Sequence, residues 1–314
     1  MKSLLAGFVA AMSLLSADFD WNLPKGFPRP VVPAGNPMSA VKVELGRYLF
    51  YDKRISVNGK QSCASCHRQE LAFTDGRAKA EGTTGQAHSR GTMSLVNVAY
   101  APALTWANPE LASLEEQALI PMLGEHPVEL GLKGREREFL AVVRGEPVYS
   151  KLFPQAFPGE SDVFSLVNIC KAIAAFERTI ISMRSPYDRY RWGDDRSAIS
   201  DAAKRGELLF FSSERAGCFQ CHAGWNFSGR FFDTGIAKES GKFRAPTLRN
   251  VAVTAPYMHD GSVATLEDVI DRYAAGGKVR AFTLTDGDKR DLIEFLKSLT
   301  EEGLLRDPRW SNPW

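Results

Sequence analysis

The stretches Cys63-Ala-Ser-Cys-His67 and Cys218-Phe-Gln-Cys-His222 decide how this sequence is interpreted, because they carry the same Cys-x-x-Cys-His pattern. The residues upstream match as well, with Gly46-Arg-Tyr-Leu-Phe50 before the first copy and Gly206-Glu-Leu-Leu-Phe210 before the second. Both upstream stretches fall in segments of helical pattern, at about residues 39–51 and 200–211. We therefore expect two related domains, each with a helix, a loop and the pattern.

The Cys-x-x-Cys-His pattern is the attachment site of a c-type haem. Each of its two thiols can bond to one vinyl group of a haem, and the adjacent histidine then binds the iron. One haem would be held by Cys63, Cys66 and His67, and a second by Cys218, Cys221 and His222. A zinc site would need four soft ligands in one tetrahedron and would leave both histidines unexplained. A thioredoxin-like redox pair would need a βαβ context, which the sequence lacks.

The rest of the sequence indicates a mainly α-helical protein. The chain has 314 residues, 44% hydrophobic and 24% charged, which is typical of globular proteins and long enough for two domains. Capping residues and apolar periodicity predict further helices at residues 113–123, 134–143, 161–183, 265–273 and 286–299. The polar stretch 187–197 is the expected connection between domains. The expected fold class is mainly α, with two cytochrome c-like haem domains packed together.

The N-terminus is typical of an export signal. Lys2 precedes an apolar run from Leu4 to Leu15, and small residues follow at Ser16 and Ala17, which predicts a signal peptide over residues 1–17. The run is short for a membrane span, and an uncleaved anchor is the alternative. We therefore expect a periplasmic protein with no membrane span after signal removal. The net charge of +2 gives no electrostatic footprint for nucleic acid.

The sequence says less about the fifth cysteine and about the second axial ligand of each haem iron. Cys170 lies in an apolar helical segment, so we expect a buried free thiol. The second axial ligand of each iron decides between electron transfer and peroxide chemistry. The local sequence leaves that choice open among His88, Met93, His126, Tyr257, Met258, His259 and Tyr273.

Together with the two haem motifs, several further stretches resemble the bacterial di-haem cytochrome c peroxidase / MauG superfamily. They are Gln117-Ala-Leu-Ile-Pro121, Pro127-Val-Glu-Leu130, Phe176-Glu-Arg-Thr179, Ser185-Pro-Tyr-Asp-Arg189, Ala245-Pro-Thr-Leu-Arg-Asn-Val251 and Pro256-Tyr-Met-His-Asp-Gly261. The resemblance covers nearly all of the chain after residue 17. Asp18-Phe-Asp-Trp-Asn-Leu-Pro24 and Gly124-Glu-His-Pro-Val-Glu-Leu-Gly131 further resemble the MbnH-type branch, which is associated with methanobactin-type copper systems.

The resemblance implies a ligand for the second haem. In the peroxidases a Met lies 14 positions after the His of the His-Asp-Gly motif, and in MauG a Tyr lies there. His259 plus 14 is Tyr273 in this chain, so the chain resembles MauG at this position. A phenolate is a hard anionic ligand that favours oxidised iron. The alternatives are that Tyr273 is an ordinary buried aromatic and that Met258, which we expect to pack in the core, is the ligand.

The resemblance also implies an open first haem with acid–base residues beside it. Glu129 matches the family's acid/base carboxylate, Gln117 its pocket amide and Pro121 a residue that shapes the pocket. Two inserted residues precede the Pro-Val-Glu stretch, which makes Glu125 a rival base. His88 is the nearest histidine to the position that covers this haem in many peroxidases, and we expect it to be a surface loop residue.

Two further roles follow from the resemblance alone. Trp106 matches the tryptophan between the two haems, where an indole can relay electrons, although a core Trp at the domain interface would look the same. The family binds Ca²⁺ between the domains, and Thr254 and Pro256 match its carbonyl ligands. The family's Asn ligand aligns near Gly91, which has no side chain.

Together these features imply a haem peroxidase-type oxidoreductase with two covalently bound c-type haems and one Ca²⁺. Residues 18–187 would form the peroxide-reactive N-terminal domain, and residues 188–314 the C-terminal electron-transfer domain. The enzyme would use hydrogen peroxide and a bis-Fe(IV)-like state to oxidise a side chain, Trp to kynurenine, on a copper-binding periplasmic protein. The alternatives are a peroxidase that takes electrons from a small redox protein and a non-catalytic di-haem electron carrier.

Overall fold

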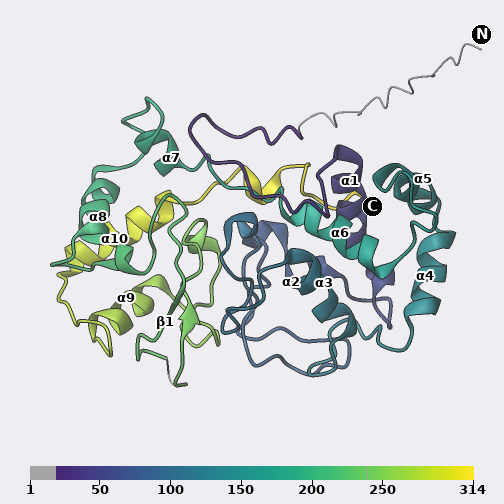
Figure 1. Ribbon diagram of the computed structural model, residues 1–314. Coiled ribbons are helices and arrows are strands. Elements are labelled where there is room, and N and C mark those ends of the chain that lie inside the picture. The colour runs from purple at the N-terminus through teal and green to yellow at the C-terminus, as the bar shows by residue number, and fades with distance from the viewer. Residues whose placement is uncertain (1–18, 238) are drawn as a thin grey trace, which may run out of the picture.

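The computed structural model describes residues 19–237 and 239–314 and is mostly helical, as the sequence predicts (Figure 1). The α-helices are α1 (Ala40–Tyr51), α2 (Cys63–Cys66), α3 (Leu114–Leu123), α4 (Glu136–Gly145), α5 (Pro147–Ala156), α6 (Leu166–Glu177), α7 (Pro186–Arg191), α8 (Asp201–Phe211), α9 (Leu266–Ala274) and α10 (Asp286–Ser298). Short 3₁₀ turns are η1 (Lys53–Ile55), η2 (Gln69–Leu71), η3 (Val98–Tyr100), η4 (Cys218–Gln220), η5 (Val251–Val253) and η6 (Leu304–Arg306). The strands β1 (Phe231–Phe232) and β2 (Phe243–Arg244) pair antiparallel.

Two clusters of buried apolar side chains lie at opposite ends of the molecule. The first draws on α1 and α3 to α6, and the second on α7 to α10 (Figure 1). The end of the chain returns to the first cluster, where Leu304 and Trp310 are buried. Two separate cores explain how each half can hold its own copy of the repeated motif.

The repeated glycines mark the same helix crossing in both halves. A Cβ on Gly46 of α1 would lie 1.9 Å from the carbonyl oxygen of Ala172 in α6. A Cβ on Gly206 of α8 would lie 2.0 Å from the carbonyl oxygen of Asp291 in α10. Only glycine allows the two backbones to approach this closely, so the matching sequence around Gly46 and Gly206 reflects a shared packing requirement.

The aromatic core beside each crossing is repeated as well. The rings of Phe50 and Phe176 are 5.1 Å apart with an interplanar angle of 56°. Their counterparts Phe210 and Phe295 are also 5.1 Å apart, at 54°. Such tilted pairs contribute beyond their buried area. The two halves therefore share a helix pair and an aromatic contact within each core.

Three elements differ from the sequence expectation. Helix α6 begins after Ser165, whose side chain accepts a hydrogen bond from the Asn168 amide, so it starts later than the predicted residue 161 and ends at residue 177. Helix α5 was not predicted, and Pro147 occupies its first turn. The stretch expected to be a polar connection instead overlaps α7, and a capping box between Ser185 and Asp188 fixes the start of this helix.

The segment before α1 crosses both halves without forming a helix, consistent with its many prolines (Figure 1). The Tyr100 hydroxyl donates to the Pro28 carbonyl at 2.7 Å, and Arg184 Nη2 donates to the Asn22 carbonyl at 2.7 Å. The predicted signal peptide, residues 1–17, lies outside the described residues. Within the described part of the chain, no helix has the length and apolar character needed to cross a membrane.

Candidate active site

The first Cys-x-x-Cys-His motif forms a short capped helix that presents its histidine. Helix α2 contains both cysteines, and a capping box between Ser62 and Ser65 fixes its start. The Nδ1 atom of His67 lies 2.9 Å from the Phe73 carbonyl oxygen, which leaves Nε2 available to a metal. Burial lowers the pKa of His67, so the imidazole is neutral, as an iron ligand must be.

A small cavity of about 60 Å³ opens beside this motif. It brings together residues far apart in the sequence, which are Cys63, Cys66, His67, Gln117, Pro121 and Glu129. Helix α3 supplies Gln117 and Pro121, and the Leu130 amide donates to the Pro121 carbonyl at 2.9 Å, which holds the Glu129 loop against α3. Two thiols, a neutral imidazole and an adjoining cavity form a donor set that fits a c-type haem.

Glu129 has the electrostatics of an acid–base group. Burial raises the pKa of Glu129 from 4.5 to about 7, because the cavity disfavours the charged carboxylate. A carboxyl group with a pKa near neutrality can both accept and release a proton at physiological pH. The rival base Glu125 does not line the cavity: it is exposed and forms an ion pair with Lys133.

His88 is not the surface residue that the sequence suggested. It lines the same cavity, and its Nε2 lies 3.6 Å from Glu129 Oε1. The His88 amide donates to the Ala80 carbonyl at 2.8 Å, which turns the loop inward. Burial lowers the pKa of His88, so a neutral imidazole lies beside the carboxyl group. His126, by contrast, is exposed.

Glu177 is a cavity residue that sequence reasoning missed. It ends α6, and its side-chain Oε2 is buried without a hydrogen-bond partner among the described residues. Burial raises the pKa of Glu177 to about 8, against a smaller opposing effect of Arg178. The Phe-Glu-Arg-Thr stretch was the available signal, but nothing in it indicates that Glu177 faces the same cavity as Glu129.

The second motif has a different environment. Its Cys218 begins η4, and His222 Nδ1 lies 3.2 Å from the Phe227 carbonyl and 3.1 Å from that of Pro246. Tyr273 lies in the last turn of α9. Burial, followed by the nearby Cys221 and Cys218 thiols, raises the pKa of Tyr273 to about 12. The phenol therefore lies close to the second cysteine pair.

Of the other axial candidates, Tyr257 and Met93 have their polar atoms engaged elsewhere, and His259 has only its Nδ1 engaged. The Tyr257 hydroxyl donates to the Val251 carbonyl at 3.1 Å, and His259 Nδ1 lies 2.8 Å from Arg90 Nη1. Met93 Sδ lies 3.4 Å from Arg244 Nη2. Met258 has a left-handed backbone with φ of 71°. Cys170 is buried, as expected of a free thiol in the core.

Trp106 lies where the two halves meet. Its indole Nε1 donates to the Gly91 carbonyl at 2.8 Å, and its own carbonyl accepts from the Arg244 amide at 2.9 Å. The side chain is half-buried. These contacts join residues on both sides of the junction. The relay role of Trp106 stays a prediction, as does calcium binding by the carbonyl groups of Thr254 and Pro256.

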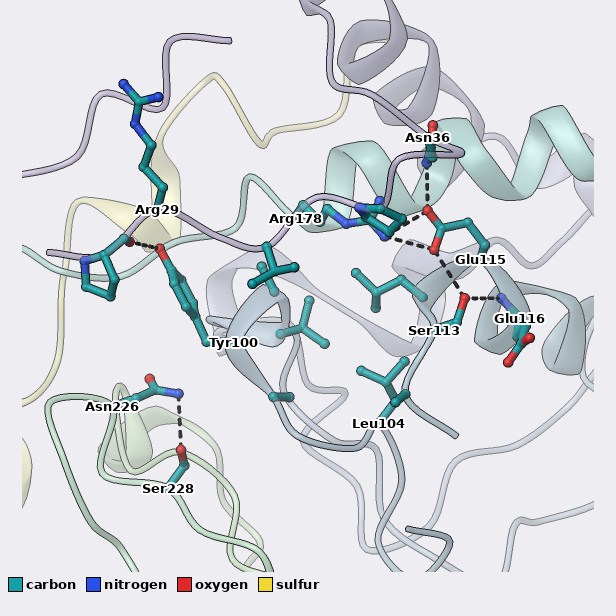
Figure 2. A pocket seen from close by; sticks show the side chains of 18 of the residues that line it. Arg29, Asn36, Tyr100, Leu104, Ser113, Glu115, Glu116, Arg178, Asn226 and Ser228 are labelled. Carbon is teal, nitrogen blue, oxygen red and sulfur yellow. Dashed lines mark hydrogen bonds and ion pairs between the residues drawn. The ribbon is translucent and has the colours of Figure 1, made fainter. Parts of the chain in front are cut away.

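Neither a zinc site formed by the cysteines nor the larger groove of the molecule accounts for the predicted site residues. Among the residues that the structure describes, no three His, Cys, Asp or Glu side chains gather into a metal cluster, so the two cysteine pairs do not form one zinc tetrahedron. A larger groove lies between the N-terminal arm and both halves, where Tyr100, Leu104 and Asn226 line it (Figure 2). The Glu115–Arg178 ion pair, at 2.7 Å, borders this groove, and none of the predicted site residues does.

Comparisons with known proteins agree with this geometry. The sequence model of the family described as di-haem cytochrome c peroxidase matches residues 40–196. The methylamine utilization protein MauG of Methylophilus methylotrophus is 34% identical over 318 residues, covering 91% of this chain and 92% of the relative. The cytochrome c551 peroxidase of Pseudomonas aeruginosa is 31% identical over 326 residues, covering 96% and 91%. A crystal structure of a MauG-like protein associated with microbial copper homeostasis has a TM-score of 0.87 at 40% identity, covering 94% of this chain and 99% of that one.

The chain therefore belongs to the di-haem cytochrome c peroxidase family, with MauG and MauG-like proteins among its relatives. It is a haem oxidoreductase, and its cofactors are two c-type haems. The residues at both motifs fit these haems, with Cys63, Cys66 and His67 at the first and Cys218, Cys221 and His222 at the second.

Proposed function

We propose that this protein is a periplasmic di-haem oxidase that uses hydrogen peroxide to convert a tryptophan of a partner protein to kynurenine. The observation that carries the proposal is the asymmetry between the two motifs. A cavity with titratable groups adjoins the first motif, whereas the Tyr273 phenol lies beside the second. The likeness to a MauG-like protein associated with copper homeostasis supports a copper-binding protein as the partner.

At the first site, the chain's contribution is to bind peroxide and move its proton. A bound haem supplies the iron at which peroxide is reduced. Glu129 accepts a proton from one peroxide oxygen and returns it to the other, which allows the O–O bond to break heterolytically. Its pKa of about 7 suits both steps. The Gln117 amide orients the peroxide by hydrogen bonding, and Pro121 limits the shape of the cavity.

At the second site, the chain favours the oxidised form of the haem. His222 and Tyr273 would hold the iron of a haem bound at this site. A phenolate stabilises oxidised iron better than a thioether, because it is a hard anionic ligand. Trp106, between the halves, relays electrons from the second site to the first. This arrangement suits a protein that takes electrons from a partner with a high oxidation potential.

The overall reaction moves electrons from the partner to peroxide. Each peroxide accepts two electrons and two protons and leaves as two molecules of water. Conversion of one tryptophan of the partner to kynurenine removes four electrons and four protons, so it consumes two peroxides. Water supplies the added oxygen, and one carbon of the indole ring leaves as formate. The export signal predicted over residues 1–17 supports a periplasmic location, and Ca²⁺ at the Thr254 and Pro256 carbonyls would support the junction between the halves.

Peroxide disposal with electrons from a small redox protein is the second candidate. It is favoured by relatives such as the cytochrome c551 peroxidase of Pseudomonas aeruginosa and the cytochrome c peroxidase of Escherichia coli, which is 32% identical over 298 residues. The Tyr at position 273 favours oxidation of a partner instead, because a Met occupies this place in the peroxidases that the sequence resembles.

The test is to co-purify the holoprotein with the product of a neighbouring gene, add peroxide and measure peptide masses of the partner. The proposal predicts that one tryptophan gains the mass change of conversion to kynurenine. The matched control is Glu129→Gln, which should leave the partner unchanged in the same time. A partner whose peptides keep their masses, together with rapid peroxide consumption when a reduced cytochrome or cupredoxin is supplied, would favour the disposal reaction.

A further inference from the structure

Arg244 is a buried guanidinium without a carboxylate partner among the described residues. It lies in β2 and is 8% exposed, with Nη1 donating to the Ala103 carbonyl at 2.7 Å. Among the residues that the structure describes, Nη2 contacts only the Met93 sulfur, at 3.4 Å, and the buried Nε has no partner. Burial lowers the pKa of Arg244 to about 10. The site therefore places a positive charge among neutral groups.

Other buried arginines of this chain are paired with acids. Arg249 is 1% exposed and binds both carboxylate oxygens of Asp188, at 2.8 and 2.9 Å. Arg178 is 3% exposed and binds Glu115 at 2.7 and 2.8 Å. A buried charge without a counterion is costly, and proteins pair or solvate such charges. The exception at Arg244 indicates an anion that belongs at this position and is not part of the polypeptide.

The surroundings of Arg244 place it between the two haem motifs. Its amide donates to the Trp106 carbonyl at 2.9 Å. Its guanidinium contacts Met93, whose backbone also interacts with the imidazole of His67. On the other side, the carbonyl of Pro246, two residues after Arg244, lies 3.1 Å from His222 Nδ1.

His259 is a second buried donor without a partner, and it touches the same short segment. Its Nδ1 faces Arg90 Nη1 at 2.8 Å and so accepts a hydrogen bond, which assigns the proton to Nε2. The residue is 5% exposed, yet Nε2 has no partner among the described residues. The ring stacks on Phe243 at 3.9 Å, and the His259 carbonyl accepts from the Gly91 amide at 2.9 Å. Buried polar atoms are almost always hydrogen-bonded, so this donor also indicates a missing acceptor.

We infer that Arg244 and His259 bind propionate carboxylates of the haems where the two halves meet. A c-type haem carries two carboxylates, and its covalent attachment through Cys-x-x-Cys leaves both available to the protein. Arg244 supplies the compensating charge and His259 a neutral N–H donor. Both are positioning residues, because they act on the haem edge and not on peroxide. The inference rests on the two c-type haems of the family and is independent of which partner is oxidised.

The test measures the midpoint potentials of both haems by spectroelectrochemical titration of the holoprotein. Arg244→Gln should lower the potential of one haem, because loss of a positive charge at its edge favours the ferric form. Arg244→Lys should keep most of the original value. The haem whose potential moves identifies whose propionate is bound. Arg205→Gln, which breaks the exposed pair with Asp291, is the control and should change neither potential. Unchanged potentials in Arg244→Gln would overturn the assignment.

If Arg244→Gln does not fold, the wild-type protein offers a second test. A crystal structure of the wild-type holoprotein should place a haem carboxylate oxygen within hydrogen-bond distance of Arg244 Nε and another beside His259 Nε2. Water or a small inorganic anion at Arg244 Nε would overturn it. His259→Gln, which keeps an N–H donor, should retain the potential that His259→Leu changes.

Discussion

The two Cys-x-x-Cys-His sites share one scaffold but differ in their surroundings. In both, a phenylalanine with a left-handed backbone presents its carbonyl to Nδ1 of the motif histidine. The first contact is 2.9 Å, from His67 to Phe73, and the second is 3.2 Å, from His222 to Phe227. The duplicated scaffold thus orients the motif histidine in the same way twice.

The surroundings explain how one scaffold can serve two purposes. The first site adjoins a cavity that holds Glu129, Glu177 and His88. The second has a half-buried tyrosine, Tyr273, beside its cysteines. The comparison teaches that the helix pair and motif determine where a haem is attached, whereas residues contributed by distant segments determine what the haem can do.

The largest expected effect comes from removing the phenol. In Tyr273→Met, oxidation of the partner should be lost, because a thioether stabilises oxidised iron poorly. Peroxide should still react at the first site, where no residue has changed. Stopped-flow spectra after peroxide addition, with a near-infrared region included, and partner peptide masses measure the two effects separately. If this variant oxidised the partner as well as the wild type does, Tyr273 would not be needed at the second site, and the proposed difference between the two sites would be wrong. Tyr257→Phe is the matched control, because its hydroxyl bonds a backbone carbonyl.

Removing the base of the first site should have the next largest effect. Glu129→Gln should slow the reaction with peroxide about 10²–10⁴-fold, the usual contribution of a positioned general base. The measurement is the rate of the haem absorbance change after mixing with peroxide. Glu125→Gln, an exposed residue of the same loop, should react as fast as the wild type. Equal slowing in both variants would argue for a distorted loop and not for a lost base.

The pH dependence of the peroxide reaction tests the role of Glu129 at the first site. Glu129 must be ionised to accept a proton, and its pKa is raised to about 7. The peroxide rate should therefore fall about tenfold for each pH unit below 7 and level off above it. The rate constant measured between pH 5 and pH 9 gives the profile, and Glu125→Gln should reproduce it. A rate that does not change across this range would contradict the role of Glu129.

The smallest expected effect concerns stability. Glu177 keeps its proton to about pH 8 in the folded protein, whereas its ordinary pKa is 4.5. The unfolded state therefore loses this proton first, and the contribution of Glu177 to stability decreases from pH 4.5 to pH 8. The loss is at most about 5 kcal/mol. Urea unfolding of the holoprotein should show Glu177→Gln gaining stability over the wild type at pH 8.5 and little at pH 4.5. Glu138→Gln, an exposed residue of α4, should show no such gain.

The sequence was sufficient for the parts of the fold and site that depend on local or repeated patterns. The two motifs and the matching Gly46 and Gly206 segments predict the paired helices. The resemblance placed Gln117, Pro121 and Glu129 in one pocket, and the structure brings them together.

Long-range packing accounts for what the sequence did not predict. His88 enters the cavity because its loop folds back onto Ala80, and Glu177 because α6 ends at the cavity wall. The sequence could not fix where α6 starts, because Ser161 and Ser165 are both suitable N-cap residues. In the structure Ser165 is the N-cap. Arg244 has no acidic partner among the described residues, and this follows only from where those residues lie in the fold.

The electron paramagnetic resonance spectrum of the resting ferric holoprotein reports directly on how many ligands each iron has. We propose that the first haem has an open axial position while Tyr273 ligates the second. We expect a high-spin ferric signal from one haem and a low-spin signal from the other. Two purely low-spin haems would contradict it, because neither iron would then be free to bind peroxide, and the protein would be an electron carrier.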